Sequence, residues 1–147
     1  MDLISRFIEQ RSAFEQSYKD DDWSRLVPFY DEDAVYEVMA MPFHCVVKGR
    51  TSILNGFQKA VTNFDRHCER TIWGNSQVSV EGSNVIVVSG LTMTRGDSPP
   101  IHTALTEISS YKDGRIVRMI DLYAPDESDK YEAWMQNWGA GLDPSYV

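Results

Sequence analysis

The spacing of hydrophobic side chains changes near residue 71 of this chain. Before that point, apolar residues recur every three or four positions, which is the spacing of one face of a helix. Asp2 is placed to cap the first of these segments, and Gly49 precedes the last of them. The pattern predicts helices at residues 2–19, 23–30 and 52–64, a β-strand at 34–38 and an irregular stretch at 39–47.

Beyond residue 71, hydrophobic and polar side chains alternate, which is typical of β-strands. Asp113 and Gly114 form the clearest hairpin signal, because both residue types tolerate the backbone of a two-residue turn. A final amphipathic segment predicts a C-terminal helix. We therefore expect four long strands and one helix in this half of the chain, at residues 71–80, 85–95, 101–111, 115–124 and 128–138.

Helices followed by a long antiparallel meander indicate an α+β fold. With 147 residues the chain has about the commonest size of one domain, so we expect a single domain over residues 1–147. Its core would span residues 3–125, and its C-terminal helix and tail residues 126–147. We predict a cone-shaped, strongly curved antiparallel sheet wrapped around the N-terminal helices. A closed eight-stranded barrel would leave two of these helices without a place to pack.

Composition limits the partners of this chain. Aromatic residues make up 12% of it, enough to fill a core or to line a cavity for a small ligand. The net charge of −8 repels phosphate backbones and anionic lipids, so we expect neither nucleic acid nor membranes as partners. The first residues lack the order of a secretion signal, no apolar run approaches a membrane span, and two cysteines make no disulfide framework. These features favour a cytoplasmic location.

The predicted hairpin brings candidate catalytic residues onto one face of the sheet. A two-residue turn at Asp113 and Gly114 places Asp121 opposite Thr106. An apolar surface with a few convergent polar groups is typical of a small-molecule site. We expect Asp121 to act as a general acid/base, because apolar surroundings raise the pKa of a carboxyl group, and His102 to orient it or share its proton. This face carries His102, Ala104, Thr106, Ile108, Val117, Met119, Asp121 and Tyr123.

The alternative is that this face is solvated and that Asp121 is a surface acid. Solvation of this face would also expose Ile108, Val117 and Met119. The opposite face is apolar as well, since it carries Leu105, Ile116, Ile120 and Leu122. Monomeric proteins rarely leave such a patch in contact with water. We therefore expect the opposite face to be the outside of the sheet, covered by a second copy of the chain in a homodimer.

Four segments of the chain carry a family resemblance. They are Asp22-Trp23-Ser24-Arg25-Leu26, the run from Phe29 to Glu37, Gly49-Arg50-Thr51-Ser52-Ile53 and Lys112-Asp113-Gly114-Arg115-Ile116. In this order and spacing they resemble the SnoaL-like and ketosteroid-isomerase-like proteins of the nuclear transport factor 2-like superfamily, over roughly residues 3–125. The resemblance implies the curved α+β fold, which hosts isomerases, dehydratases, cyclases, epoxide hydrolases and binding modules.

Different candidate residues of this chain resemble functional residues of different relatives. Where ketosteroid isomerases carry their base and their oxyanion-binding tyrosine, this chain has Val38 and Phe14, so their route is not expected. Asp121 resembles the acid/base aspartate of SnoaL-type polyketide cyclases, and His102 and Tyr18 resemble residues of scytalone-dehydratase-like members. Substrate contacts are expected from Phe14, Tyr18, Tyr36, Val38, His44, Phe57, Thr106, Met119 and Tyr123.

These observations predict a lyase or isomerase, of dehydratase or cyclase type, that acts without a cofactor on a small hydrophobic carbonyl compound. Asp121 would move the proton, and a tyrosine hydroxyl would hold the substrate oxygen. No metal site is expected, because the pairs His44-Cys45 and His67-Cys68 lack the spacing of zinc ligands. No nucleotide cofactor is expected either, because no glycine-rich phosphate loop follows a strand. The alternative is a non-catalytic module that binds a hydrophobic ligand or dimerises.

Overall fold

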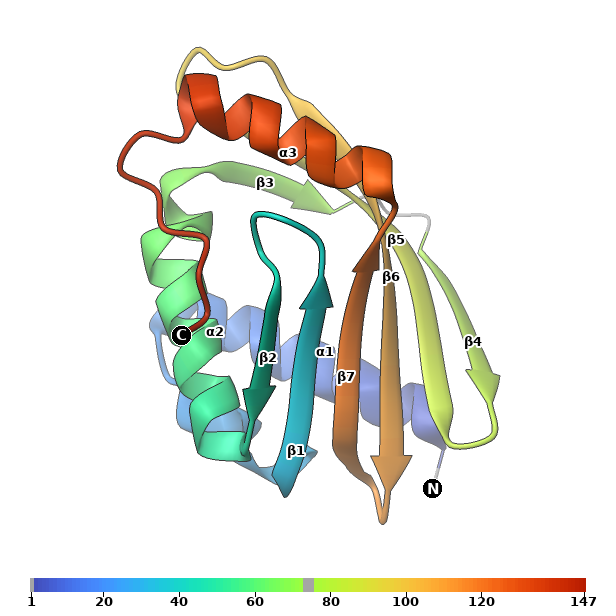
Figure 1. The fold of residues 1–147 in the computed structure, drawn as a ribbon. Coiled ribbons are helices and arrows are strands. Elements are labelled where there is room, and N and C mark those ends of the chain that lie inside the picture. Colours follow the sequence, from blue (N-terminus) through green and yellow to red (C-terminus); the bar gives the residue numbers. More distant parts are fainter. Residues whose placement is uncertain (1, 73–75) are drawn as a thin grey trace.

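The fold combines helices with one large sheet, and the computed structural model describes residues 2–72 and 76–147 (Figure 1). The α+β class that the sequence predicts is confirmed. The elements in chain order, with η for a 3-10 helix, are α1 (Leu3–Asp20), η1 (Trp23–Phe29), β1 (Tyr30–Met39), β2 (Cys45–Lys48), α2 (Arg50–Asn63), η2 (Asp65–His67), β3 (Glu69–Ile72), β4 (Gln77–Glu81), β5 (Asn84–Thr94), β6 (Ile101–Lys112), β7 (Arg115–Tyr123) and α3 (Pro125–Trp138).

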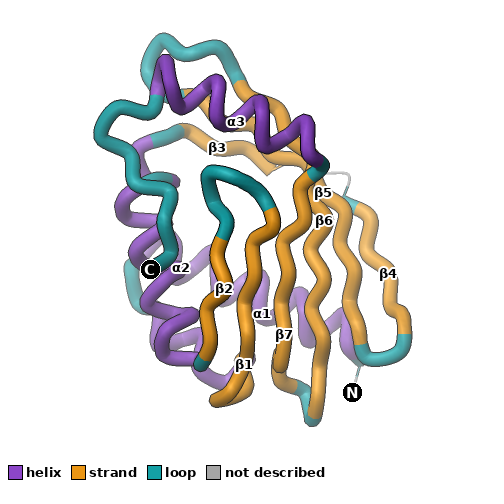
Figure 2. Tube along the Cα trace, in the orientation of Figure 1, coloured by secondary structure: helices purple, strands orange, loops and turns teal. Residues whose placement is uncertain are grey.

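The strands form one open, strongly curved sheet in the order β2-β1-β7-β6-β5-β3, with β4 also paired to β5. Strands β1 and β7 run parallel, so the sheet is mixed rather than wholly antiparallel as predicted. A parallel pair needs a long connection, and here residues 40–114, about half of the chain, separate its two strands. Helices α1 and α2 lie on one side of the sheet, and α3 crosses its end (Figures 1 and 2).

Three predicted segments differ from the structure. The stretch predicted to be irregular contains β2, in which Val46 and Val47 pair with β1. The strand predicted at 71–80 is two strands, β3 and β4, which pair with different parts of β5. Residues 73–75 of that prediction lie outside the described residues. Helix α3 begins at Pro125, earlier than predicted, because proline suits the first turn of a helix.

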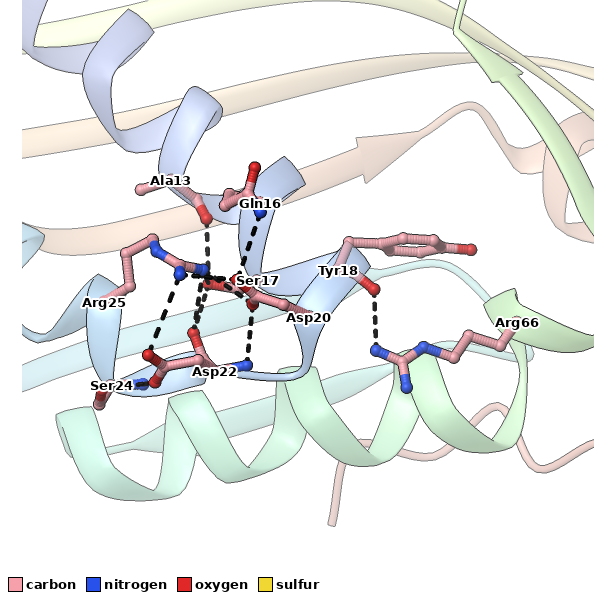
Figure 3. A network of polar contacts seen from close by, with 9 residues as sticks. All are labelled: Ala13, Gln16, Ser17, Tyr18, Asp20, Asp22, Ser24, Arg25 and Arg66. Carbon is pink, nitrogen blue, oxygen red and sulfur yellow. Dashed lines mark hydrogen bonds and ion pairs between the residues drawn. The ribbon is translucent and has the colours of Figure 1, made fainter.

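The acidic residues at 20–22 have a structural role at the end of α1. Asp21 adopts a left-handed backbone with φ of 63° and closes the helix, close to the predicted end at residue 19. The side chain of Asp22 accepts a hydrogen bond from the backbone N–H of Ser24 and so caps η1. Arg25 binds Asp20 at 2.8 Å and holds the turn together (Figure 3). These acids are therefore explained by local structure.

Two hydrophobic clusters fill the space between the helices and the sheet. In the larger cluster, the ring of Phe57 on α2 contacts the rings of Phe14, Tyr30 and Tyr36. The smaller cluster lies under α3. Phe43 and Tyr123 pack against both clusters and join them. The second cluster consists of Phe64, Met93, Ile101, Tyr131 and Trp134.

A β-bulge in β7 decides which side chains of the hairpin face the helices. Tyr111 pairs with Ile116, but the next pair joins Ser110 to Arg118, so Val117 is an extra residue in β7. From there on the register shifts by one position relative to a regular hairpin, and each odd-numbered residue of β6 faces an odd-numbered residue of β7. The predicted pairing of Asp121 with Thr106 is therefore wrong.

Candidate functional site

A cavity of about 360 Å³ lies between α1, α2 and the inner face of the sheet. Its walls are mostly aromatic and aliphatic, which suits a small hydrophobic molecule. The aromatic side chains that line it are Phe7, Phe14, Tyr30, Tyr36, Phe57 and Tyr146.

Among the described residues, the cavity is least covered between α1 and the strands β3 and β4. Ile72 and Val78, which line it on that side, are 46% and 40% exposed. Tyr36 and Gln10 line its inner end and are 3% and 1% exposed. A ligand would therefore enter past Ile72 and Val78 and reach Tyr36 and Gln10 last.

Asp121, on β7, is the central polar group at the inner end. Tyr36 on β1 donates a hydrogen bond of 2.5 Å from its hydroxyl to the Oδ2 atom of Asp121. The Oδ1 atom is buried and has no hydrogen-bond partner among the described residues. Burial and the negative charge of Glu107 raise the pKa of Asp121 to about 8, against the opposing effects of Tyr36 and Arg11. The Asp121 carboxyl group is therefore mainly neutral at pH 7.

Glu107 on β6 faces Asp121 on β7 directly across the bulged hairpin. Arg11 reaches over from α1 and donates from Nη2 to both oxygens of Glu107, at 2.7 and 2.6 Å. A carboxylate with a guanidinium partner keeps its negative charge even when it is buried. The site therefore places a neutral carboxyl group next to an ionised one.

Neutral hydrogen-bonding groups complete the inner end. Burial and the nearby charge of Asp121 raise the pKa of Tyr36 well above its usual 10, so its hydroxyl keeps its proton. Gln10 donates to the hydroxyl of Tyr30 at 2.9 Å, and Tyr30 donates to the sulfur of Met119 at 3.8 Å. The Oε1 atom of Gln10 is buried without a hydrogen-bond partner among the described residues.

A second polar cluster lines the cavity nearer its mouth. Arg70 on β3 donates to Glu15 on α1 at 2.7 Å, and its guanidinium lies 4.1 Å from the ring centre of Tyr18. Asp65, in η2, also lines the cavity. Burial raises the pKa of Asp65 to about 6, an effect that Arg70 opposes and Glu15 reinforces. The three charged side chains thus share one wall.

The C-terminal tail supplies one more wall of the cavity. The ring of Tyr146 lies edge-on to that of Tyr36, with centroids 5.5 Å apart. Lys59 on α2 donates to the backbone oxygen of Val147 at 2.6 Å. The tail approaches α2 so closely that a Cβ atom at Gly56 would lie 2.8 Å from the carbonyl oxygen of Tyr146. Glycine at this position lets the tail reach the cavity.

The structure brings five of the predicted site residues to the cavity. Their side chains come from four different elements, and Asp121 is among them. They are Phe14, Tyr36, Phe57, Met119 and Asp121.

The predicted pair of Asp121 and His102 is wrong. Because of the bulge at Val117, His102 and Thr106 point away from the cavity, to the outer face of the sheet. His102 is exposed there, and its Nδ1 atom lies 2.7 Å from the hydroxyl of Thr92. Glu107 takes the place next to Asp121 that the sequence assigned to the imidazole.

Four other residues predicted to contact the substrate are not among the described residues that line the cavity. His44 is exposed in the turn between β1 and β2. Tyr18 lies beneath Arg70, and its backbone carbonyl accepts a hydrogen bond from Arg66 (Figure 3). Val38 is part of the larger core cluster, and Tyr123 packs against Phe43.

Sequence reasoning missed Arg11, Glu107 and Tyr146. A signal existed for Arg11, because it interrupts the apolar face of an otherwise amphipathic helix. Glu107 was assigned to the wrong face by the regular hairpin register. Tyr146 lies in a tail without any periodic pattern, so its position could not be predicted.

The described residues provide no candidate metal site, no membrane-spanning helix and no paired cysteines. Among residues 2–72 and 76–147, no group of three or more His, Cys, Asp or Glu side chains is placed to hold a metal ion. No helix in the described part of the chain is long and apolar enough to cross a bilayer. Cys45 and Cys68 are free thiols.

Comparison with known proteins identifies the family. The sequence matches the SnoaL-like domain over residues 11–119, and no curated protein matches it. A nuclear transport factor 2-like protein from Burkholderia xenovorans LB400 has a similar structure, with a TM-score of 0.67 and 10% identity, covering 86% of this chain and 95% of its own.

Two other solved structures carry functional names. A candidate polyketide cyclase from Xanthomonas campestris pv. campestris has a TM-score of 0.60 and 13% identity, covering 92% of this chain and 98% of its own. An LEH-like epoxide hydrolase from M. tuberculosis has a TM-score of 0.57 and 15% identity, covering 86% and 84%. At such identities these likenesses concern the fold, which hosts small-molecule catalysts and binding proteins alike. The family match shows that this chain belongs to the SnoaL-like family, and its fold is similar to that of nuclear transport factor 2-like proteins.

Proposed function

We propose that this protein is a cofactor-independent lyase or isomerase that uses Asp121 as a general acid/base on a small hydrophobic carbonyl compound. The observation that carries the proposal is the raised pKa of Asp121, about 8, at the inner end of an aromatic cavity. A carboxyl group with a pKa near the working pH can both give and take a proton.

The two facing carboxyl groups divide the chemistry between them. In a proton shift next to a carbonyl, neutral Asp121 donates its proton to the substrate oxygen, and ionised Glu107 takes the proton from carbon. The oxygen then returns its proton to Asp121 while Glu107 delivers its proton to the new carbon, so the enzyme ends unchanged. The Tyr36 hydroxyl, which donates to Asp121, holds the acid in place.

The same pair of carboxyl groups favours a second candidate reaction, the addition of water to an epoxide. Asp121 would protonate the ring oxygen as the C–O bond breaks, and Glu107 would take a proton from the water that attacks carbon. The product is a diol, and proton transfer from Glu107 to Asp121 restores the site. This candidate rests on one neutral and one ionised carboxyl group lying side by side.

The test is a proton-exchange assay that needs no knowledge of the natural substrate. Small cyclic and aromatic ketones are incubated in D₂O, and exchange next to the carbonyl is followed by NMR; matching epoxides are scored for diol formation. Asp121→Asn should lower the rate about 10²–10⁴-fold. The exposed Asp129→Asn on α3 is the matched control and should keep the full rate.

A binding module would behave differently in this assay. Compounds would then bind in the cavity, but every exchange and hydration rate would equal that of buffer, and Asp121→Asn would change nothing. That result would overturn the catalytic proposal and leave the cavity as a ligand-binding site.

A further inference from the structure

The cavity carries a second polar cluster that the proposed reaction does not use. Arg11 and Glu15 are four residues apart on α1, which separates them by about 6 Å along the helix. Arg11 belongs to the inner cluster with Glu107 and Asp121. Glu15 belongs to the outer cluster with Arg70 and Asp65. One wall of the cavity therefore has two polar groups, about one helical turn apart.

The two clusters differ in charge. At the inner end, Arg11 balances Glu107 while Asp121 is mainly neutral. At the outer end, Arg70 faces two acids, Glu15 and Asp65, so this end has an excess of negative charge at pH 7. A bound anion, such as a carboxylate or phosphate, would be repelled there.

The outer cluster also has an unused hydrogen-bond acceptor. Arg70 donates to Oε2 of Glu15, whereas Oε1 of Glu15 is buried without a hydrogen-bond partner among the described residues. Asp65 lines the cavity as well. A buried acceptor without a partner costs free energy, which a ligand that donates a hydrogen bond would recover.

Most of the remaining lining of the cavity is apolar. Phe14, Val61 and Leu91 are among these side chains. A ligand that touches both clusters therefore needs a hydrophobic body with a polar group at each end.

We propose that the ligand of this cavity carries a hydroxyl or protonated amine on the side opposite its reactive oxygen, and that Glu15 and Asp65 accept the hydrogen bond from this group. The inference rests on the proposed function, because that function identifies the inner end as the reactive one. The substrate class is then a hydroxylated or aminated cyclic ketone, and acids and phosphate esters are excluded.

The test compares three probes that share one ring ketone: 6-hydroxy-1-tetralone, 6-methoxy-1-tetralone and 6-carboxy-1-tetralone. Their Kd values are measured by calorimetry at pH 7. The hydroxyl probe should bind about 10-fold more tightly than the methoxy probe, because only the hydroxyl group can donate a hydrogen bond to a charged acceptor. The carboxylate probe should bind most weakly.

Variants locate the preference and separate it from catalysis. In the double variant Glu15→Gln/Asp65→Asn the ratio of hydroxyl to methoxy affinity should fall toward one, and the control Asp129→Asn should keep the full ratio. Asp121→Asn should lower the rate of proton exchange about 10²–10⁴-fold yet keep the ratio, so the two proposals fail separately. Equal affinities, tightest binding of the carboxylate, or no binding of the hydroxyl probe would each overturn the inference.

Discussion

Asp121 and Glu107 face each other across β7 and β6, and one of the two carboxyl groups keeps its proton at neutral pH. The extra residue Val117 in β7 produces this pairing, since a regular hairpin would put Thr106 opposite Asp121. Two adjacent carboxyl groups in apolar surroundings cannot both ionise without a large cost. Arg11 favours the charge on Glu107, so the proton stays mainly on Asp121.

The stability of the protein should therefore decrease as the pH rises toward 8. The pKa of Asp121 is about 8 in the folded protein and near 3.8 when unfolded, so between these values the folded state binds more protons. The unfolding free energy then falls with increasing pH. Asp121→Asn removes this contribution, so urea denaturation at pH 5 and pH 8 should show a smaller decrease for the variant. Identical pH dependence in both proteins would contradict the assignment.

Removal of the Arg11 guanidinium should destabilise the fold. Arg11→Met keeps the stem that packs under the sheet but leaves the buried Glu107 without its partner, at a cost of about 1–3 kcal/mol. The double variant Arg11→Met/Glu107→Gln should recover part of this loss. Urea denaturation measures each free energy of unfolding.

The control for this prediction is the exposed carboxylate of Glu9, which pairs with Arg6 on α1. Surface pairs contribute little, so Glu9→Gln should change the free energy of unfolding by less than about 0.5 kcal/mol. An equal loss for Arg11→Met and Glu9→Gln would show that the buried pair has no special role.

Gly56→Ala should displace the C-terminal tail from α2. Alanine favours the helix by about 1 kcal/mol, but its Cβ atom would lie 2.8 Å from the carbonyl oxygen of Tyr146, so the tail has to move. We expect faster amide exchange over residues 143–147 and weaker ligand binding. Asn55→Ala, at an exposed neighbouring position on α2, gains helix propensity without touching the tail and should show neither effect.

The outer face of the sheet should join two copies of the chain. Leu105 and Ile116 face inward, contrary to the prediction, but Ile108, Ile120, Leu122 and the exposed Val88 lie on the outer face. We expect a dimer in light scattering at micromolar concentration. Ile120→Glu should yield monomers by burying a charge in the interface, whereas Ile8→Glu, on the exposed side of α1, should leave the dimer intact. A monomeric wild-type protein would refute this expectation.

The periodicity of the sequence determined the helices, the long strands, the turn at Asp113 and Gly114, and Asp121 as the candidate acid. These features are local, because each depends on residues a few positions apart. The partners of Asp121 were decided by the tertiary structure. No local pattern marks the bulge at Val117, which reverses the faces of β6 relative to β7. Arg11 and Tyr146 reach the same cavity from opposite ends of the chain, and such contacts follow from the packing of α1 and the tail against the sheet rather than from any sequence spacing.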